Sequence, residues 1–220
     1  METHNTVHMS EERVLHVYSD ARKKDQEDTW DALSVIESQF KVEHVHVLRD
    51  SDYGDIIKRN WGRGHNLILV EQDIVPAAGQ IRELLSCRGN LCAFPYLVKA
   101  DIPNRYSVFN FQRGKRPDNW KTFDNSRYIG NIPIEKRPKY CGLSGFGLTK
   151  ISIKAQEKFN FPKLYNLGRW DIIDSWLSLN LYERVGRNRI FHLHYPPVKH
   201  NHYSDMPNPA PEPPGTLLVF

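Results

Sequence analysis

The sequence has few cysteines, no long apolar run and no excess of one charge. Its three cysteines (Cys87, Cys92 and Cys141) are odd in number and lack the C-x-x-C spacing, so they indicate neither a disulfide framework nor a zinc knuckle. No stretch approaches the roughly 18 apolar residues of a membrane span. Residues 1–14 contain no apolar core of signal-peptide length. We therefore expect a soluble protein of a reducing, cytoplasmic compartment.

Two common phosphate-binding fingerprints are also missing. The sequence contains neither GxGxxG nor GK[ST], so neither a dinucleotide-binding turn nor a P-loop is supported. Its 30 lysines and arginines are interspersed with 26 acidic residues, for a formal net charge of +4. This mild balance suits an anionic small molecule as well as it suits nucleic acid, and it selects neither.

The length and composition predict one domain followed by a tail. With 220 residues, 40% of them hydrophobic, the chain can bury a substantial core. We expect a single domain over residues 1–204, with a first half at 14–98 and a second half at 99–204. The proline-dense stretch MPNPAPEPPG falls in 205–220, which we expect to be an extended surface tail.

The first half alternates strand-like and helix-like patterns. Apolar and β-branched residues predict strands at 14–19, 41–50, 66–73 and 90–98, with helical spacing at 21–40, 53–61 and 77–87. This alternation predicts an α/β fold with a mostly parallel central sheet, flanked by helices and joined by right-handed crossovers. Ligands bind at the carboxyl ends of the strands in such sheets.

The second half is less regular. Residues 100–138 are rich in Asn, Arg, Pro and aromatic residues, which predicts loops and short strands. Thr149 is then a candidate N-cap for a helix over 151–159. A largely buried helix is expected over 168–186, and a last strand followed by a histidine-rich turn over 189–203.

Acidic residues gather at the expected ligand edge of the sheet. Glu71 and Asp73 follow the apolar run LILV, and Asp20 and Asp50 end two other predicted strands. On a strand, residues i and i+2 share a side, so Glu71 and Asp73 would repel each other, and each would cost several kcal/mol if buried unpaired. A cationic partner is therefore expected: a basic side chain, a helix N-terminus or a divalent metal.

Three other groups have both structural and functional interpretations. The glycines at 142, 145 and 147 form a tight turn or let a sugar or diphosphate approach the backbone. Asp171 and Asp174 fit a variant of the capping box, although one of them can cap the helix while the other has a functional role. His192 and His194 share one face of a strand, where core histidines are more common than ligands, whereas His200 and His202 lie in a turn that favours ligation.

The combination of these motifs resembles the GT-A-fold glycosyltransferases, which use nucleotide-sugar donors. The resemblance extends from Val14 to about His202 and rests on HVLRDSD, GHNLILVEQD, CGLSGFGLTK, WDIIDSWLSLNLYERVG and PPVKHNH. It implies a Rossmann-like GT-A fold in which an acid-x-acid motif holds a divalent metal against the donor diphosphate. The first half would then bind the nucleotide, and the second half would supply the acceptor site and catalysis.

The resemblance implies a role for each candidate residue. Mn²⁺ or Mg²⁺ would be held by Asp73 directly, by Glu71 directly or through water, and by His200, with His202 as the alternate. Asp174, or else Asp171, would accept the proton of the acceptor hydroxyl. The nucleotide pocket would contain Tyr18, Ser19, Asp20, Asp50 and Asp52, and the sugars would lie against Gly145, Gly147 and Trp170.

We therefore expect a metal-dependent glycosyltransferase that moves a sugar from a nucleoside diphosphate to a hydroxyl acceptor, with inversion slightly preferred. The acceptor would be a carbohydrate or another hydroxyl compound, and a nucleic-acid acceptor stays open. One alternative is a nucleic-acid or anion-binding module that uses the basic, aromatic segment RYSVFNFQRGKRPDNWK at 105–121. Another is a metal-dependent phosphohydrolase that cleaves nucleotide-sugars without an acceptor.

Overall fold

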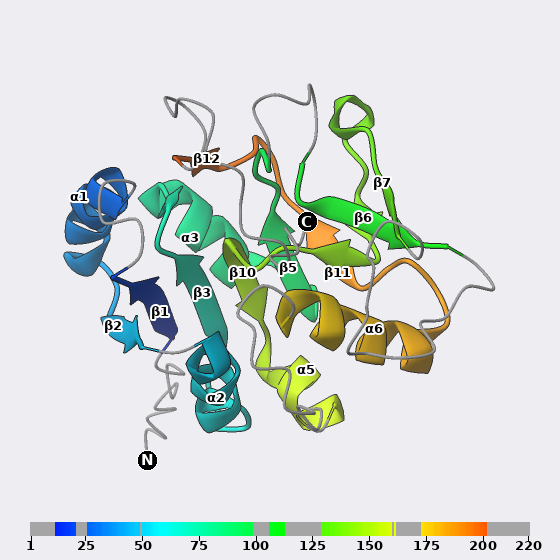
Figure 1. The fold of residues 1–220 in the computed structure, drawn as a ribbon, viewed down its shortest axis with the longest axis horizontal. Coiled ribbons are helices and arrows are strands. Elements are labelled where there is room, and N and C mark those ends of the chain that lie inside the picture. Colours follow the sequence, from blue (N-terminus) through cyan, green and yellow to red (C-terminus); the bar gives the residue numbers. More distant parts are fainter. Residues whose placement is uncertain are drawn as a thin grey trace, which may run out of the picture.

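A central β-sheet organises the computed structural model, which describes residues 12–20, 26–48, 50–98, 106–112, 129–159, 161 and 173–201. Among these residues, seven strands form the sheet in the order β2-β1-β3-β10-β5-β11-β8 (Figure 1). Their bounds are β1 Arg13–Ser19, β2 Val42–Val47, β3 Leu67–Glu71, β5 Leu91–Phe94, β8 Tyr140–Cys141, β10 Leu148–Ile151 and β11 Phe191–Leu193. A single sheet therefore unites the two predicted halves of the chain.

Helices and two smaller sheets surround this centre. The helices are α1 Glu27–Glu37, α2 Asp50–Asn60, α3 Ala78–Ser86, α5 Ile153–Lys158 and α6 Ile173–Val185, with a 3₁₀ turn η3 at Ile134–Lys136. One small sheet pairs β4 (Ile74–Val75) with β12 (Lys199–His200), and the other contains β6 (Val108–Phe111), β7 (Ile129–Asn131) and β9 (Leu143–Ser144). Among the described residues, no helix combines the length and apolar character needed to cross a bilayer.

The predicted α/β class with a mostly parallel sheet is confirmed. Strand β1 pairs in parallel with β2 and β3, and β5 pairs in parallel with β11. Between β3 and β5 lies β10, which is antiparallel to both of them. Because β10 comes from the second half, the first-half strands β3 and β5 are joined by hydrogen bonds only through a segment that follows much later in the chain.

The strand β10 contradicts one local prediction. Thr149 is not a helix cap: it lies within β10, fully buried, in register with Leu69 and Ala93. Helix α5 is capped by Ser152, whose side chain accepts a hydrogen bond from the Ala155 backbone N–H at 3.1 Å. The run LTKI therefore forms a central strand, because its neighbours bury both of its faces regardless of its local helix signal.

Alternating strand residues build a core on each face of the sheet. Val14, Ile68 and Val70 pack with Leu33 of α1 and Leu84 of α3. A second core cluster lies on the opposite face, where strand residues pack with residues of α2, α5 and α6. Its members include Leu15, Val17, Leu67 and Leu69 from the strands and Ile56, Ile57, Ala155, Leu177 and Leu181 from the helices. The period of two along each strand thus gives a three-layer arrangement with helices on both faces.

Two strand ends differ from the prediction, and both differences affect candidate site residues. Strand β2 stops at Val47, and Asp50 begins α2 instead of ending the strand; an acidic residue is favourable in the first turn of a helix. Strand β3 ends at Glu71, and a turn at Gln72 and Asp73 leads into β4. Glu71 and Asp73 therefore do not occupy equivalent positions on one strand.

The irregular segment at 100–138 contains two short strands, β6 and β7, as predicted, and the 3₁₀ turn η3 lies near its end. Its residues 100–105 and 113–128 lie outside the described residues, as does the proline-rich tail at 205–220.

Candidate functional site

The turn after β3 places two carboxylates at the carboxyl end of a central strand. Glu71 is partly buried, and its Oε1 accepts a hydrogen bond from the hydroxyl of Tyr53 on α2 at 2.9 Å. The Glu71 backbone N–H donates to the Gly147 carbonyl at 2.9 Å. Strand, helix and glycine loop therefore meet at this side chain.

The middle residue of the turn, Gln72, fastens the turn to the end of β1. Its Oε1 accepts hydrogen bonds from the backbone N–H and the hydroxyl of Ser19, at 2.9 and 3.0 Å, and from Gln26 Nε2 at 3.2 Å. Gln26 Nε2 also donates to the Ser19 carbonyl at 2.8 Å. The end of β1, which is predicted to bind a nucleotide, is thus held directly against the turn at residues 71–73, which we call the acid turn.

Asp73 is buried beside a histidine from the far end of the chain. The Asp73 side chain is 9% exposed, and its Oδ2 lies 3.2 Å from Nε2 of His200. His200 Nδ1 lies 2.7 Å from the Leu97 carbonyl. A carbonyl oxygen can only accept, so Nδ1 carries the hydrogen. In a neutral ring, the lone pair of Nε2 would then point toward the Asp73 carboxylate, and these two acceptors would repel each other. A proton or a cation between them would remove this repulsion.

Backbone pairing holds this contact in place. Strand β12 pairs with β4, with His200 opposite Ile74. The Asn201 backbone N–H donates to the Asp73 carbonyl at 2.9 Å. The predicted association of the late histidine with the acid motif is therefore present in the structure, whereas ligation by either residue stays a prediction.

Helix α6 brings a third carboxylate to the same place. Asp174 lies in the first turn of α6, and its Oδ1 accepts a hydrogen bond from the Ser175 backbone N–H at 2.5 Å. Its charge acts on Glu71, on Tyr53 and on Tyr96. Segments at 71–73, 174 and 200 therefore converge, as expected from the sequence.

The convergence of acids changes the ionisation of Glu71. Burial is the largest cause, and the charges of Asp73 and Asp174 add to it; together they raise the pKa of Glu71 from 4.5 to about 8, although the Tyr53 hydrogen bond opposes the shift. Removal of a carboxylate from water and the approach of like charges both favour its protonated form. Without a cation, this group of acids therefore retains a proton at neutral pH.

Tyr96 occupies the space next to two of the glycines. A Cβ at Gly145 would lie 2.1 Å from the Tyr96 hydroxyl oxygen, and one at Gly147 would lie 2.5 Å from Cε1 of the same ring. The Tyr96 ring also contacts His200, with 4.9 Å between centroids. The pKa of Tyr96 is raised by burial and then by Glu71, Asp174 and Asp73. The absence of side chains at the two glycines therefore leaves room for Tyr96 beside Glu71, Asp73, Asp174 and His200, which we call the acid cluster. The predicted contact of the glycines with a sugar stays a prediction.

The candidate nucleotide residues lie near the carboxyl end of β1. Tyr18 stacks on His46, with ring centroids 4.9 Å apart, and His46 Nε2 lies 3.5 Å from Asp20 Oδ2. Asp52, on α2, accepts a hydrogen bond from the Leu48 backbone N–H at 3.3 Å. These contacts place the group at the same sheet edge as the acid turn. Trp170, Asp171 and His202 lie outside the described residues, as does the side chain of Asp50.

Sequence reasoning missed four side chains of this site: Tyr53, Gln72, Gln26 and Tyr96. Gln72 sits inside the acid-x-acid motif, and Tyr96 lies near the carboxyl end of the strand predicted at 90–98, so position alone could have indicated both. Tyr53 and Gln26 have no such signal, because their contacts span 18 and 46 residues. Only the folded chain brings them to the turn.

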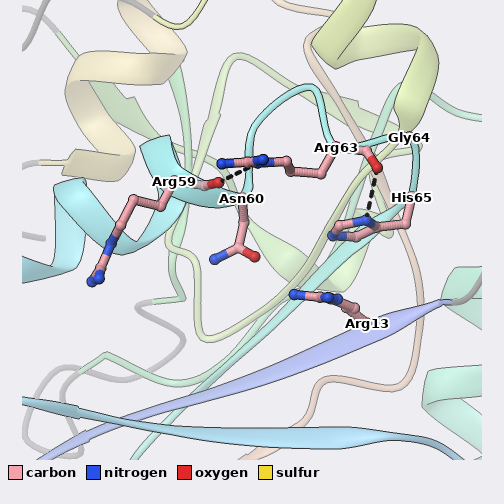
Figure 2. A pocket seen from close by; sticks show the side chains of 6 residues that line it. All are labelled: Arg13, Arg59, Asn60, Arg63, Gly64 and His65. Atoms are coloured by element: carbon pink, nitrogen blue, oxygen red, sulfur yellow. Dashed lines mark hydrogen bonds between the residues drawn. The ribbon is translucent and has the colours of Figure 1, made fainter.

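A basic hollow lies on another part of the molecule, at the start of β1 and the end of α2. It has a volume of about 490 Å³ and is lined by Arg13, Arg59, Asn60, Arg63, Gly64 and His65. Figure 2 shows Arg13, Asn60 and His65 around one space, with Arg63 above them. The Arg63 side chain donates to the Arg59 carbonyl at 3.0 Å. This hollow is basic and does not include the acid turn.

A second set of potential metal ligands lies apart from the acids: Cys87, Cys92, His192 and His194. The structure joins Cys87 and Cys92 as a disulfide. The expectation that the cysteines form no such pair is therefore wrong, because the fold brings together two sulfurs whose spacing matches no common disulfide pattern. Cys141 is free and buried.

Comparisons with known proteins show limited similarity. The sequence matches no protein-family model and no curated protein. The fold is similar to the crystal structure of A197 from STIV, with a TM-score of 0.45 and 11% identity, covering 90% of this chain and 100% of that chain. It is also similar to 4-diphosphocytidyl-2C-methyl-D-erythritol synthase from Anaerococcus prevotii, with a TM-score of 0.38, 8% identity and coverages of 87% and 90%. Similarity at this level assigns neither a family nor an activity.

The raised pKa of Glu71 predicts a pH-dependent stability in the presence of a chelator. The unfolded carboxyl loses its proton near 4.5 but the folded one near 8, so the free energy of unfolding falls as pH rises through that window. Glu71→Gln removes this dependence. Relative to wild type, we expect the variant to gain stability on the order of 2 kcal/mol between pH 5 and pH 8, measured by urea unfolding in EDTA.

The control for this series is Asp55→Asn, because Asp55 is an exposed acid on α2. Its stability should follow that of wild type at every pH. A constant difference between Glu71→Gln and wild type across the pH range would show that Glu71 has an ordinary pKa.

The contact between Tyr96 and the glycines predicts that substitutions at Gly145 and at Tyr96 have strongly non-additive effects on the free energy of unfolding. Gly145→Ala should lower the free energy of unfolding by about 1 to 3 kcal/mol, because the new methyl group displaces the Tyr96 ring. In a Tyr96→Ala background the same change should cost much less. Gly79→Ala is the matched control, since its added Cβ meets no atom within 4 Å. Equal costs for Gly145→Ala in both backgrounds would contradict the contact.

Proposed function

We propose that this chain is a metal-dependent glycosyltransferase that transfers a sugar from a nucleoside diphosphate to a hydroxyl acceptor. The observation that carries the proposal is the meeting of Glu71, Asp73, Asp174 and His200 at the carboxyl edge of a mostly parallel sheet. These residues come from segments separated by up to 129 positions in the sequence, and three of them carry negative charge when ionised. Such a group needs a cation.

The donor set fits a hard divalent ion. Carboxylate oxygens with an added imidazole suit Mg²⁺ or Mn²⁺, which retain positions for water and phosphate oxygens. Asp73 and His200 would hold the ion, and Glu71 would hold it directly or through a water molecule. The Leu97 carbonyl fixes the tautomer of His200 that presents Nε2 to the ion. When bound, the ion neutralises charge on the departing nucleoside diphosphate.

The neighbouring groups suit the donor nucleotide. The end of β1, with Ser19 and Asp20, is tied to the acid turn through Gln72, so a nucleoside lying there would direct its diphosphate toward Asp73. Tyr53 donates to Glu71 and the acids act on Tyr96, so these two rings would limit access of water to a bound donor. Exclusion of water protects a reactive donor from hydrolysis.

Asp174 is the candidate base for the acceptor. It lies in the first turn of α6, its charge acts on Glu71, and its Oδ1 accepts a hydrogen bond from the Ser175 backbone N–H. A carboxylate at this position would accept the proton of an attacking hydroxyl. Direct displacement at the anomeric carbon by such a hydroxyl inverts the configuration. Asp171 remains the alternative base, since it is close in sequence.

Two other functions use the same chain differently. A phosphohydrolase would use Asp73 and Glu71 to activate water, and it would cleave nucleotide-sugars at a rate independent of any acceptor. An anion-binding or nucleic-acid-binding module is favoured by the basic hollow with Arg13, Arg59 and Arg63. Its binding would weaken with salt and would be unaffected by a chelator.

The donor site predicts a metal-dependent stabilisation by one class of nucleotide. We expect one nucleoside diphosphate or nucleotide-sugar, with Mn²⁺, to raise the free energy of unfolding by about 2.7 kcal/mol at 100 times its dissociation constant. The shift should vanish in EDTA and in Asp73→Ala. The measurement is thermal unfolding with a panel of nucleotides, each with Mn²⁺ or EDTA.

Asp55→Ala serves as the matched control, because it removes an exposed carboxylate that is not part of the turn; it should retain the shift. The panel includes a single-stranded oligonucleotide at two salt concentrations. Stabilisation by the oligonucleotide in EDTA, with none by any nucleotide in Mn²⁺, would refute the transferase and support the binding module.

If Asp174 is the base, its replacement should slow sugar transfer without weakening nucleotide binding. Asp174→Asn retains the hydrogen bond to Ser175 but cannot take up a proton, so we expect transfer to fall by about 10²- to 10⁴-fold. Stabilisation by the nucleotide should persist. Release of nucleoside diphosphate is measured with the nucleotide-sugar identified above and a panel of monosaccharides and glycosides. Release that no acceptor stimulates would identify a hydrolase, and full activity of the variant would exclude Asp174 as the base.

A further inference from the structure

Four side chains with metal-binding atoms meet at a place that the proposed transfer does not use. Cys87 follows the last residue of α3, Cys92 lies in β5, and His192 lies in β11 with His194 just after it. The parallel pairing of β5 and β11 sets His192 directly opposite Cys92. One ligand atom from each of the four lies within 4.8 Å of all the others.

The environment of His194 points to a ligand for its second nitrogen. His194 is only 9% exposed, and its Nδ1 lies 2.6 Å from Oε1 of Glu83 on α3. Within the part of the chain that the structure describes, the buried Nε2 has no hydrogen-bond partner. A carboxylate on one nitrogen and a metal on the other is a common arrangement of histidine ligands, because the carboxylate fixes the tautomer and strengthens the donor.

The loop between the cysteines is shaped around their sulfurs. The Gly89 backbone N–H donates to Cys87 Sγ at 3.3 Å, and Cys92 Sγ lies 3.5 Å from the Gly89 carbonyl oxygen. A Cβ at Gly89 would lie 2.8 Å from Cys92 Sγ, so this position has no room for a larger residue. The spacing C-x₄-C is within the range of cysteine pairs in structural zinc sites.

One separation between ligand atoms is close to the spacing around a tetrahedral ion. Zinc bonds of about 2.3 Å to sulfur and 2.0 to 2.1 Å to nitrogen place neighbouring ligand atoms roughly 3.3 to 3.8 Å apart. Cys87 Sγ and His192 Nδ1 are 3.2 Å apart. The two cysteine Cα atoms are 7.0 Å apart, at the upper limit of the separation that disulfides span. Two thiolates and two imidazoles are a donor set that favours zinc over magnesium or manganese.

We propose that, in the reduced chain, Cys87, Cys92, His192 and His194 bind one Zn²⁺ in a closed, four-coordinate structural site. The disulfide and the zinc site are alternative states of the same two sulfurs. A dithiol reductant supplies two electrons and two protons to the disulfide and gives two thiols. Zn²⁺ then displaces both thiol protons and forms two zinc–sulfur bonds. With all four positions filled by protein, this ion has no place for a substrate.

The site would tie α3 to two strands of the sheet. Cys87 directly follows α3, whereas Cys92 lies on β5, His192 lies on β11 and His194 follows β11. Lys150 of β10 supports the same loop through a hydrogen bond from Nζ to the Cys87 carbonyl. None of the four proposed zinc ligands belongs to the acid cluster, so the two proposed metal sites use different side chains.

The test uses the full chain, reduced and freed of metal, then supplied with Zn²⁺ alone and dialysed. We expect one zinc per chain by elemental analysis and a higher unfolding temperature than in EDTA. Replacement by Co²⁺ should give the visible bands of a tetrahedral ion and a near-ultraviolet thiolate charge-transfer band. Cys87→Ser and His194→Ala should lose the bound ion.

A gentler variant guards against simple loss of folding. Glu83 is half-exposed, so Glu83→Gln should leave the fold intact while weakening zinc affinity by about 10- to 100-fold. Cys141→Ala removes a thiol outside the cluster and should retain one zinc. Circular dichroism reports folding in each variant.

The acid cluster also contains a histidine and could bind zinc, so zinc bound there must be distinguished from zinc bound by the cysteines. Asp73→Ala should retain one zinc with an unchanged cobalt spectrum, although it loses the manganese-dependent nucleotide shift. Zinc that is lost in Asp73→Ala but retained in Cys87→Ser would place the ion among the acids and overturn the proposal. A reduced wild type that holds no zinc and shows no thiolate band would overturn it as well.

Discussion

The cost of burying carboxylates at the end of β3 governs the arrangement of this molecule. Asp73 is almost enclosed, and burial, followed by the charges of Asp73 and Asp174, raises the pKa of Glu71 to about 8. Each neighbour of the turn reduces part of that cost: Tyr53 donates to Glu71, and His200 faces Asp73. Because these partners come from a helix and from the last described strand, the acid turn links the beginning and the end of the fold.

Much of the fold follows from local patterns in the sequence. Strands of apolar and β-branched residues, separated by helical spacings, correctly predicted the α/β class and a mostly parallel sheet. The antiparallel β10 was not predicted in this way, since it is only four residues long, Thr149 also suits a helix N-cap, and its pairing depends on β3 and β5. The end of β2 was misplaced for a related reason: a helix start at Asp50 is decided by only a few residues.

The candidate site was predicted where chemistry and position coincide, and missed where only the fold brings groups together. Glu71, Asp73, Asp174 and His200 stood out because charged or ligating residues occur at strand or helix ends, and they do converge. The roles of metal ligand and base remain proposals. The cysteine and histidine cluster escaped notice because its members are dispersed, and only the β5–β11 register sets Cys92 beside His192.

The position of β10 has a consequence for how the chain folds. Strands β3 and β5 are complete by residue 94, but the strand that joins them ends at residue 151. Until then each carries an unpaired edge of exposed backbone groups, which is a template for wrong pairing with another chain. Closing such a distant contact is also slow. During synthesis, the apolar centre of this sheet must therefore wait for more than fifty further residues, an interval in which binding by a chaperone would be most useful.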